Sequence, residues 1–364
     1  MLFCAGIIPL FSAETLNRFG SAMQVYVVAG LRLCYGGAIL GNDGHYGMNL
    51  KKNKIPYGLI ALCLGWLSLM ILVVPVDYDW TITLRDHRVR ALDRFMGRTL
   101  FEGESIGGGD PVIFFILFTV AAYCLAWKHG STSRFYAWRP HLGFILTSAL
   151  TCSVLMVHSL KWVMGRARPV LVVKDRFPFS DWFVFGPHFI TEGTYRGSFP
   201  SGHTAQAFVA ISLAYVLAAA FSQPRRIRWA GWIWGGIALC YVALMGISRC
   251  MTLSHWLSDV LGALGLSWIL MHAIYFWMLK IPAQIDHYHN FGRHPETPVV
   301  WELRLCLHLL GMVLGGMAGL LGVRAVLLGT QWAFYLLIPA GGVIFGFFYR
   351  RFQRLYLKVM EGLS

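Results

Sequence analysis

Residues 142–169 read LGFILTSALTCSVLMVHSLKWVMGRARP, in which nineteen residues without Asp, Glu, Lys or Arg run into three cations within eight positions. An α-helix needs about 20 apolar residues to cross the hydrocarbon core of a bilayer. The stretch therefore predicts a transmembrane helix that ends in a cationic segment at one membrane face.

Seven further runs without acidic or basic residues flank this stretch on both sides, which predicts an all-α, polytopic integral membrane protein with about eight transmembrane helices. Strings of Lys and Arg separate the runs. The eight predicted spans are Tyr57–Val76, Pro111–Trp127, Leu142–Leu160, Thr204–Phe221, Trp229–Ile247, Val260–Leu279, Leu305–Val323 and Ala325–Tyr349.

The composition excludes several other classes of protein. With 57% hydrophobic and 13% charged residues, the chain has too few charges to cover a water-facing surface or to remain disordered. The net charge of +14 fits loops that face anionic lipid, so no nucleic-acid partner is expected. The eight cysteines lie singly, without a CxxC spacing, and are interpreted as small apolar residues rather than disulfides or metal ligands.

The positions of the cations predict the orientation. Sixteen Lys and Arg residues fall on the side of both termini and thirteen on the other, the latter mostly in two long segments, where the positive-inside rule counts for less. Both termini are therefore expected in the cytoplasm, in an inner membrane.

Three domains are predicted. Residues 1–54 form an N-terminal extension that fits the span pattern poorly, because Arg32 interrupts its apolar run; it is either an interfacial segment or a mis-assigned start, with translation beginning at Met48. Residues 55–280 form a six-span core that includes a basic amphipathic segment, 81–100, expected as a helix on the outer membrane surface, and a loop, 170–197. Residues 281–364 form a connector, a transmembrane hairpin and a basic tail.

A first polar cluster follows the third span. Lys161 and Arg168 are seven residues apart, two turns if the helix continues, so both would share one face and repel each other unless an anion lies between them. The alternative is a plain cationic cap that stops the span.

A second cluster precedes the fourth span. Gly197–His203 reads GSFPSGH, and such a turn at a helix start leaves backbone N–H groups free to bind an anion beside His203. The alternative is ordinary N-capping by Ser201.

A third cluster lies between the fifth and sixth spans. His255 and Asp259 are four residues apart, so on a helix the carboxylate would orient the imidazole as a base or nucleophile. The alternative is a buried pair that only satisfies polarity.

The alternation of spans places all three clusters at the same membrane face. Together they supply Lys161, two arginines (Arg168 and Arg249), Ser201, free amides, two histidines and Asp259, which is a phosphate clamp with acid–base groups. No metal-ligand set accompanies them, so no cofactor is expected and the cations are expected to replace a metal.

This arrangement resembles the type-2 phosphatidic acid phosphatase family, the membrane branch of the superfamily of vanadium haloperoxidases and bacterial acid phosphatases. The resemblance covers about Tyr57–Leu279 and leaves residues 1–47 and the last two spans outside. The family pattern Lys-x6-Arg-Pro, Pro-Ser-Gly-His and Ser-Arg-x5-His-x3-Asp is met at every position, by Lys161, Arg168–Pro169, Pro200–His203, Ser248–Arg249, His255 and Asp259.

The resemblance implies that His255, oriented by Asp259, attacks phosphorus to form a phosphohistidine, and that His203 protonates the leaving alcohol. It also implies the groups that bind the phosphoryl oxygens: Lys161, Arg168, Ser201, the Gly202 amide and Arg249.

A lipid-phosphate phosphatase at the periplasmic face is therefore the leading hypothesis. Its expected substrate is phosphatidylglycerol phosphate, phosphatidate, undecaprenyl diphosphate or lipid A phosphate. A lipid phosphotransferase with the same intermediate is the alternative, and a non-catalytic lipid binder or transporter is disfavoured by the intact motifs. The aromatic loop 170–196 suits either a lipid entrance or an interfacial anchor.

The hairpin contains a small-xxx-small repeat, Gly311/Gly315/Gly319, which predicts close packing against another helix in the same chain or in a homo-oligomer. Because every motif residue precedes Lys280, chemistry is not expected to need this hairpin.

Overall fold

The computed structural model describes residues 57–188, 197–218, 224–294, 297–298, 300–329 and 332–361. All regular elements in these ranges are helical, which confirms the all-α class. The expectations for residues 1–54 lie outside the described residues. The described chain divides between Leu72 and Val73, so α2 (Tyr57–Val73) belongs to one unit and the other helices to a second.

The prediction of a polytopic membrane protein is confirmed. Seven helical runs in the described ranges are long and apolar enough to cross a membrane: Gly58–Asp86, Asp110–Thr132, Tyr136–Val173, Arg225–Met251, Leu257–Phe291, Trp301–Leu327 and Trp332–Glu361. The predicted span 204–221 corresponds to a shorter apolar run, Gly202–Ala218, beyond which residues 219–223 are not described.

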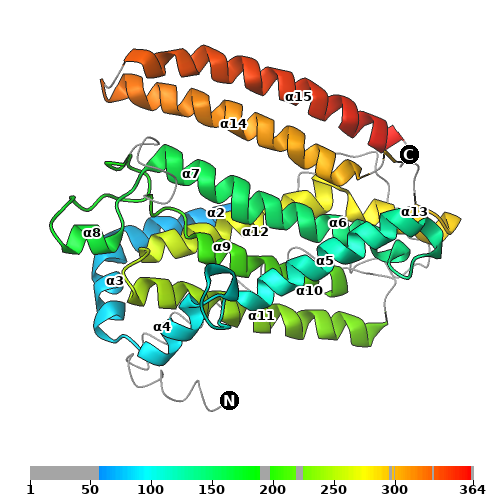
Figure 1. Cartoon of the computed structure of the whole chain (residues 1–364), viewed down its shortest axis with the longest axis horizontal. Helices are drawn as coiled ribbons and strands as arrows, with labels where there is room; N and C mark the ends of the chain where they lie inside the picture. Colours follow the sequence, from blue (N-terminus) through cyan, green and yellow to red (C-terminus); the bar gives the residue numbers. More distant parts are fainter. Residues whose placement is uncertain are drawn as a thin grey trace. The chain divides into compact units, whose positions relative to one another are not determined.

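The second unit is a bundle of helices, and a long loop separates α8 from α9 (Figure 1). Its elements are η3 (Val74–Val76), α3 (Asp77–Asp86), α4 (Arg90–Gly97), η4 (Leu100–Glu102), α5 (Asp110–His129), η5 (Gly130–Thr132), η6 (Tyr136–Trp138), α6 (Arg139–Ser148), η7 (Ala149–Met156), α7 (Val157–Met164), α8 (Pro169–Val173), α9 (Gly202–Phe208), η9 (Val209–Ile211), α10 (Ser212–Ala218), α11 (Arg225–Met251), α12 (Leu257–Ala273), η10 (Ile274–Met278), α13 (Ile281–Phe291), α14 (Trp301–Leu327), η11 (Trp332–Leu336) and α15 (Leu337–Glu361).

Small residues set the close approach of the core helices. A Cβ on Gly231 of α11 would lie 2.6 Å from the backbone nitrogen of Ala218 in α10, and a Cβ on Gly246 would collide with Val260 of α12. Close backbone contact of this kind is the usual way in which apolar helices pack inside a membrane, where no hydrophobic force draws them together.

The segment 81–100 forms two short helices rather than the single helix predicted. The helix α3 ends at Asp86 and α4 begins at Arg90, because Val89 between them is extended, with φ −90° and ψ 96°. Leu84 and Met96 are buried, while Phe95 is exposed. The amphipathic character is thus present in each short helix, and the position of the segment on the membrane surface stays a prediction.

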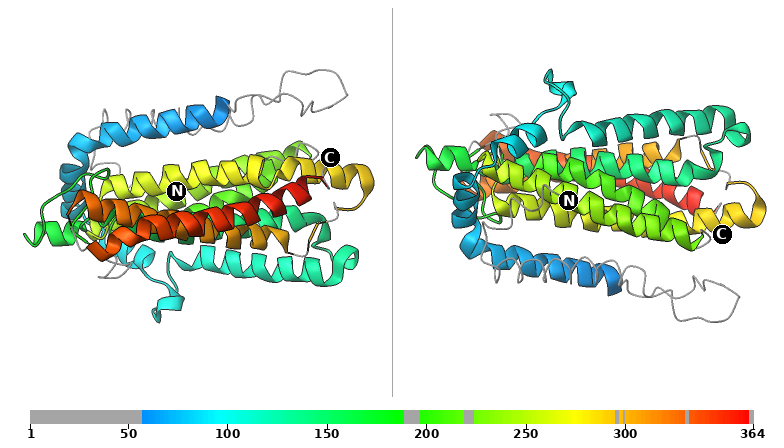
Figure 2. Two further views of the ribbon diagram at one scale, coloured as in Figure 1. Left: turned by 90° about the horizontal axis from the view of Figure 1, so that it is seen from above. Right: turned by 90° about the horizontal axis from the view of Figure 1, so that it is seen from below.

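The C-terminal hairpin consists of α14 and α15, which lie side by side (Figures 1 and 2). A Cβ on Gly311 would collide with the ring of Phe348, and a Cβ on Gly315 would lie 2.5 Å from the backbone nitrogen of Phe345. The close packing predicted from these glycines is therefore made inside the chain, between the two arms of the hairpin. Homo-oligomerisation through Gly311, Gly315 and Gly319 stays a prediction.

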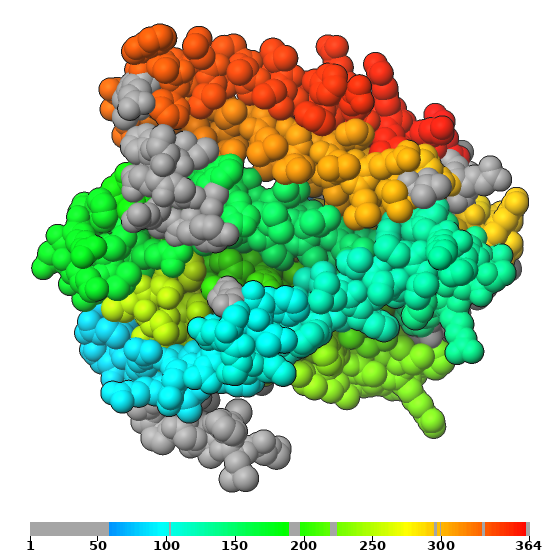
Figure 3. Space-filling view, viewed as in Figure 1, coloured from blue at the N-terminus to red at the C-terminus, as the bar shows by residue number. Residues whose placement is uncertain are grey.

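The N-terminal end of α14 is anchored to the core by a buried polar contact. Tyr123 of α5 donates a 2.7 Å hydrogen bond to Oε2 of Glu302, whose side chain is fully buried. A Cβ on Gly143 of α6 would lie 3.0 Å from that side chain, so the glycine makes room for it. The orange and red hairpin accordingly lies along the green helices in the space-filling view (Figure 3).

Candidate active site

Lys161 and Arg168 come together in a different way from the one predicted. The helix α7 ends at Met164, because Gly165 is left-handed (φ 57°) and a Cβ there would collide with the carbonyl of His188. Arg168 then lies in an extended stretch, as the residue before a proline usually does, and precedes α8. The two cations thus do not share a face of one helix; the chain turns back at Gly165.

The loops that carry the three polar clusters are joined by hydrogen bonds, as expected if they share one membrane face. The chain segments run beside one another at the ends of α7, α9, α11 and α12. The bonds are Ser198 N to Arg166 O (2.9 Å), Val170 N to Leu253 O (3.1 Å), Trp256 Nε1 to Ala167 O (2.9 Å) and Ser201 N to Asp259 O (3.0 Å).

Ser201 caps α9, so the plainer of the two interpretations of the second cluster is present in the structure. Its Oγ accepts a hydrogen bond from the Thr204 hydroxyl at 2.9 Å and a long one from the Thr204 amide at 3.5 Å. The start of α9 nevertheless faces a cation, because a Cβ on Gly202 would lie 3.9 Å from Nζ of Lys161. Capping and an anion site at this helix start are therefore compatible.

His255 and Asp259 face each other, although only Asp259 lies on the helix. The helix α12 begins at Leu257, and His255 lies in the turn before it. Nδ1 of His255 is 3.5 Å from Oδ2 of Asp259, while that same oxygen accepts a 2.8 Å hydrogen bond from the Trp256 amide. The predicted i,i+4 relation on one helix is thus wrong, but the turn brings the pair within reach of each other.

The charges around His255 favour its neutral form. Its side chain is 2% exposed, and burial lowers the pKa of His255 to about 4; Asp259 opposes this effect, and repulsion from Lys161 and Arg168 adds to it. His203, the second residue of α9, is close enough to interact electrostatically with Arg249, His255 and both of these cations. The two imidazoles thus lie within one cluster of cations.

Sequence reasoning missed a buried ion-pair network behind this pair. Arg166 is fully buried and donates 2.8 Å hydrogen bonds to Oδ1 of Asp259 and to Oδ2 of Asp77, the first residue of α3. Asp77 also accepts a 2.8 Å hydrogen bond from the Ser258 amide, and Thr81 accepts one from the Leu257 amide at 3.1 Å. Side chains of α3 therefore satisfy the first amides of α12 and hold the turn that carries Asp259.

A signal for this network was present in the sequence. Asp77 is an acid directly after an apolar run, and Arg166 lies between the two cations of the first cluster. Ionisable residues at such depth are costly unless they are paired, so each calls for a partner. Which partner it is depends on the fold, because Asp77 and Arg166 are 89 residues apart in the sequence.

A second missed residue comes from the hairpin. Arg324 of α14 is fully buried and donates hydrogen bonds to the carbonyls of Val163 (2.8 Å), Gly186 (2.6 Å) and His188 (3.0 Å). It thereby places a positive charge on the C-terminal end of α7, the helix of Lys161, where the helix dipole favours one. The hairpin thus supports the site, which the position of the motifs alone did not indicate.

Some aromatic residues of the loop 170–196 pack on the turns that carry the motifs. Phe179 contacts Trp256 edge to face at 4.8 Å, and Trp182 stacks on Phe199 at 6.2 Å. Phe183 is 56% exposed, so it remains available to lipid. Phe189 and Tyr195 lie outside the described residues.

The PAP2 superfamily model matches residues 142–282, a range that contains all three motifs. The segment 142–282 is therefore similar to proteins of the PAP2 superfamily. The resemblance predicted from the motifs is confirmed, although the match begins at the third span rather than at Tyr57. No curated protein and no solved structure matches the chain.

The PAP2 superfamily includes phosphatases and phosphotransferases, and the groups of this site are compatible with such chemistry. Cationic side chains and helix-start amides match the charge of a phosphoryl group, and a neutral imidazole can act as a nucleophile. Asp77 and Arg324 both lie outside the matched range. Parts of the chain beyond residues 142–282 therefore hydrogen-bond to the matched segment and help to hold it in place.

Proposed function

We propose that this protein is a membrane phosphatase that removes phosphate from a lipid headgroup through a phosphohistidine on His255. The observation that carries the proposal is the pairing of a neutral, buried His255 with Asp259 at 3.5 Å, close to the cations Lys161 and Arg168. A histidine that only satisfied polarity would not need Lys161, Arg168 and Arg249 around it.

The proposed reaction has two steps. Nε2 of His255 attacks phosphorus while the bond to the lipid oxygen breaks, and His203, which takes up a proton when the anionic phosphate binds among the cations, gives that oxygen a proton. Water then attacks the phosphohistidine, its proton passes back to His203, and phosphate leaves. Lys161, Arg168, Arg249, Ser201 and the Gly202 amide would hold the three equatorial oxygens, where charge is spread in the transition state.

The membrane location supports a lipid as the substrate. The first and third motif loops lie at the ends of α7, α11 and α12, which belong to candidate spans, and the second precedes the shorter apolar run Gly202–Ala218. A site at the end of such helices is at the depth of lipid headgroups. We propose that this face is the periplasmic one. More Lys and Arg residues lie on the opposite side of the membrane, the side of both termini, which is expected to be cytoplasmic.

Leaving-group dependence tests the two histidines separately. We expect His255→Ala to abolish turnover of every phosphate ester, because the nucleophile is lost. His203→Ala should abolish turnover of a lipid phosphate but retain measurable hydrolysis of p-nitrophenyl phosphate, whose phenolate leaves without a proton. The exposed His129 of α5 provides a control, and His129→Ala should keep wild-type rates on both substrates.

Rapid-quench labelling then tests the intermediate. Radiolabelled phosphate from the substrate should appear on the wild-type protein in an acid-labile, base-stable form and should be missing in His255→Ala. Labelling of His255→Ala at the wild-type level would overturn the assignment of the nucleophile. Transfer of the label to an added lipid alcohol faster than to water would favour the phosphotransferase alternative.

Metal independence forms part of the same proposal. The cationic residues are expected to supply the charge that a divalent ion supplies in other phosphatases, so activity should persist in EDTA and orthovanadate should inhibit. Loss of activity in EDTA with recovery on adding magnesium would contradict this view of the pocket.

A further inference from the structure

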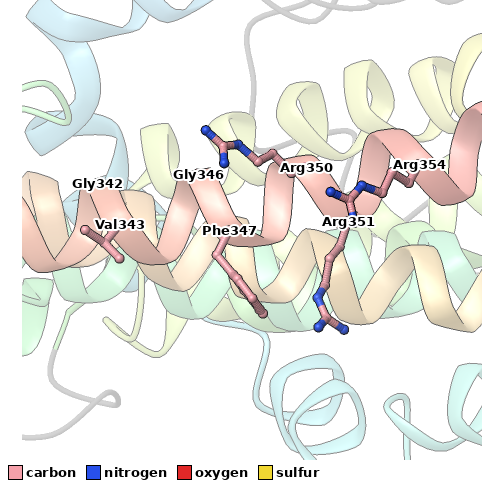
Figure 4. Close-up of a pocket in the computed structure, with 7 residues that line it drawn as sticks. All are labelled: Gly342, Val343, Gly346, Phe347, Arg350, Arg351 and Arg354. Atoms are coloured by element: carbon pink, nitrogen blue, oxygen red, sulfur yellow. The ribbon is translucent and has the colours of Figure 1, made fainter.

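The outer face of α15 carries a groove of about 490 Å³ that the proposed phosphatase reaction does not use (Figure 4). A Cβ on Gly342 or Gly346 would meet nothing within 4 Å. The two glycines lie about one turn apart, and their missing side chains leave a notch on the exposed face of the helix. The groove is lined by Gly342, Val343, Gly346, Phe347, Arg350, Arg351 and Arg354, all from this helix.

The two ends of the groove differ in chemistry. Gly342, Val343, Gly346 and Phe347 form an apolar end, with Val343 73% exposed. The other end carries three arginines, Arg350, Arg351 and Arg354. The guanidinium of Arg351 lies 4.6 Å from the ring centroid of Phe347, and the two side chains extend to the same side of the helix in Figure 4.

The arginines lie at the membrane face opposite the candidate active site. The two arms of the hairpin are antiparallel, and Arg324 at the end of α14 contacts the loops of the site. Near the far end of α15, Tyr356 donates a 2.8 Å hydrogen bond to the carbonyl of Trp277, which lies about five turns beyond Asp259 in the same helical run. From Trp332 to Arg350 the helix rises by about 27 Å, close to the thickness of about 30 Å of a hydrocarbon core.

We propose that this groove binds an anionic phospholipid of the leaflet opposite the active site. An acyl chain would fill the notch at Gly342 and Gly346, and the headgroup phosphate would meet the three arginines at the membrane boundary. Basic clusters at the end of a membrane helix attract anionic headgroups. Arginine suits this role because its planar fork donates two hydrogen bonds to a phosphate.

A second copy of the chain fits the groove less well. Two glycines four residues apart also occur where membrane helices dimerise. A symmetric pair places the same patch on both partners, and in a parallel arrangement the arginines of one copy would face those of the other. Charge complementarity therefore favours a lipid over a second α15.

Matched sets of cations test the proposal on the full-length protein. Phosphatidylglycerol is titrated into detergent-solubilised protein and binding is followed by native mass spectrometry, with phosphatidylcholine of the same chains as reference. We expect the triple variant Arg350→Gln/Arg351→Gln/Arg354→Gln to bind phosphatidylglycerol about tenfold more weakly than wild type. The control variant replaces Arg225, Arg226 and Arg228 at the start of α11, which changes the charge equally at the same membrane face; it should bind as wild type does.

A second pair of variants tests the groove without changing charge. Gly346→Leu should fill the notch and weaken phosphatidylglycerol binding. The control is Gly236→Leu on α11, where a Cβ also meets nothing within 4 Å, and it should leave phosphatidylglycerol binding unchanged. All four variants should keep wild-type phosphatase rates. Equal losses in both triple variants, or a preference for phosphatidylcholine, would overturn the lipid site, and a dimer that Gly346→Leu abolishes would assign the groove to a second copy.

Discussion

Two arginines, Arg166 and Arg324, are fully buried at the same end of the bundle but are held by different chemistry. Arg166 pairs with two carboxylates, Asp77 and Asp259, and so links α3 to the turn that presents the histidine pair. Arg324 donates to the carbonyls of Val163, Gly186 and His188, and so links the hairpin to the end of the helix that carries Lys161.

The two arginines support different parts of the proposed phosphate site. The side with the proposed nucleophile needs a defined charge state, because Asp259 must stay ionised to orient His255, and a buried cation provides it. The side with Lys161, the proposed phosphate-binding lysine, needs only a fixed position, which hydrogen bonds to backbone carbonyls provide. The first support should therefore be more costly to lose than the second.

The largest effect is expected for Arg166→Met. It leaves Asp77 and Asp259 buried without their cation, and breaking such a pair typically costs about 3–5 kcal/mol. We expect a large fall in thermal stability and at least a hundredfold loss of kcat. Adding Asp77→Asn should restore part of the lost stability but not kcat, because Asp259 still lacks its partner. Wild-type kcat in Arg166→Met would refute the link between this network and catalysis.

A smaller effect is expected for Arg324→Gln. The carbonyl clamp is weakened and the end of α7 can shift, so kcat/KM should fall about tenfold while His255 still becomes phosphorylated; misplacement of about 1 Å can cost up to about 100-fold. Arg324→Lys should recover part of the loss. The control is Arg304→Gln, at an exposed arginine of the same helix, which should have no effect on the rate. An unchanged kcat/KM in Arg324→Gln would show that the hairpin is dispensable for the site.

The charge state of His255 gives a pH-dependent effect. Because its folded pKa of about 4 lies below the ordinary value of 6.5, the unfolded chain binds more protons between these values. Its contribution to stability is therefore complete above about pH 6.5, declines as the pH falls toward 4 and then levels off. Histidine-labelled NMR titration, with His255→Gln to identify the resonance, should show a neutral ring at pH 6; a ring that titrates near 6.5 would contradict the effect of burial.

The smallest effect is expected at the other end of α14, for Tyr123→Phe. This change removes the 2.7 Å hydrogen bond to Glu302. We expect a loss of about 1–3 kcal/mol in the free energy of unfolding, because the buried Glu302 carboxyl loses its hydrogen-bond donor. The value of kcat should not change, because this contact lies far along α14 from Arg324. A loss of kcat comparable to that of Arg324→Gln would show that the hairpin acts as one unit and not through the clamp.

Much of the fold follows from simple patterns, and the errors have physical causes. Charge-free runs identify the helices, and their alternation places three polar clusters at one face. Local geometry is less predictable: periodicity assigns Lys161 and Arg168 to one helix face, but Gly165 ends α7, and it assigns His255 to α12, which begins two residues later. In both cases the helical periodicity is applied beyond the true end of the helix, past Met164 in α7 and before Leu257 in α12.

Hydrophobic length and motif spacing are properties of the chain alone, and they are enough to predict an all-α membrane protein and the motif residues of the candidate site. The groups that support those residues depend on how the helices pack. Asp77 and Arg324 are distant from the motifs in the sequence, and no periodicity relates them. Only packing shows that Asp77 pairs with Arg166 and that Arg324 binds the end of α7. A buried charge needs a partner, and the fold determines which group lies near enough to be that partner.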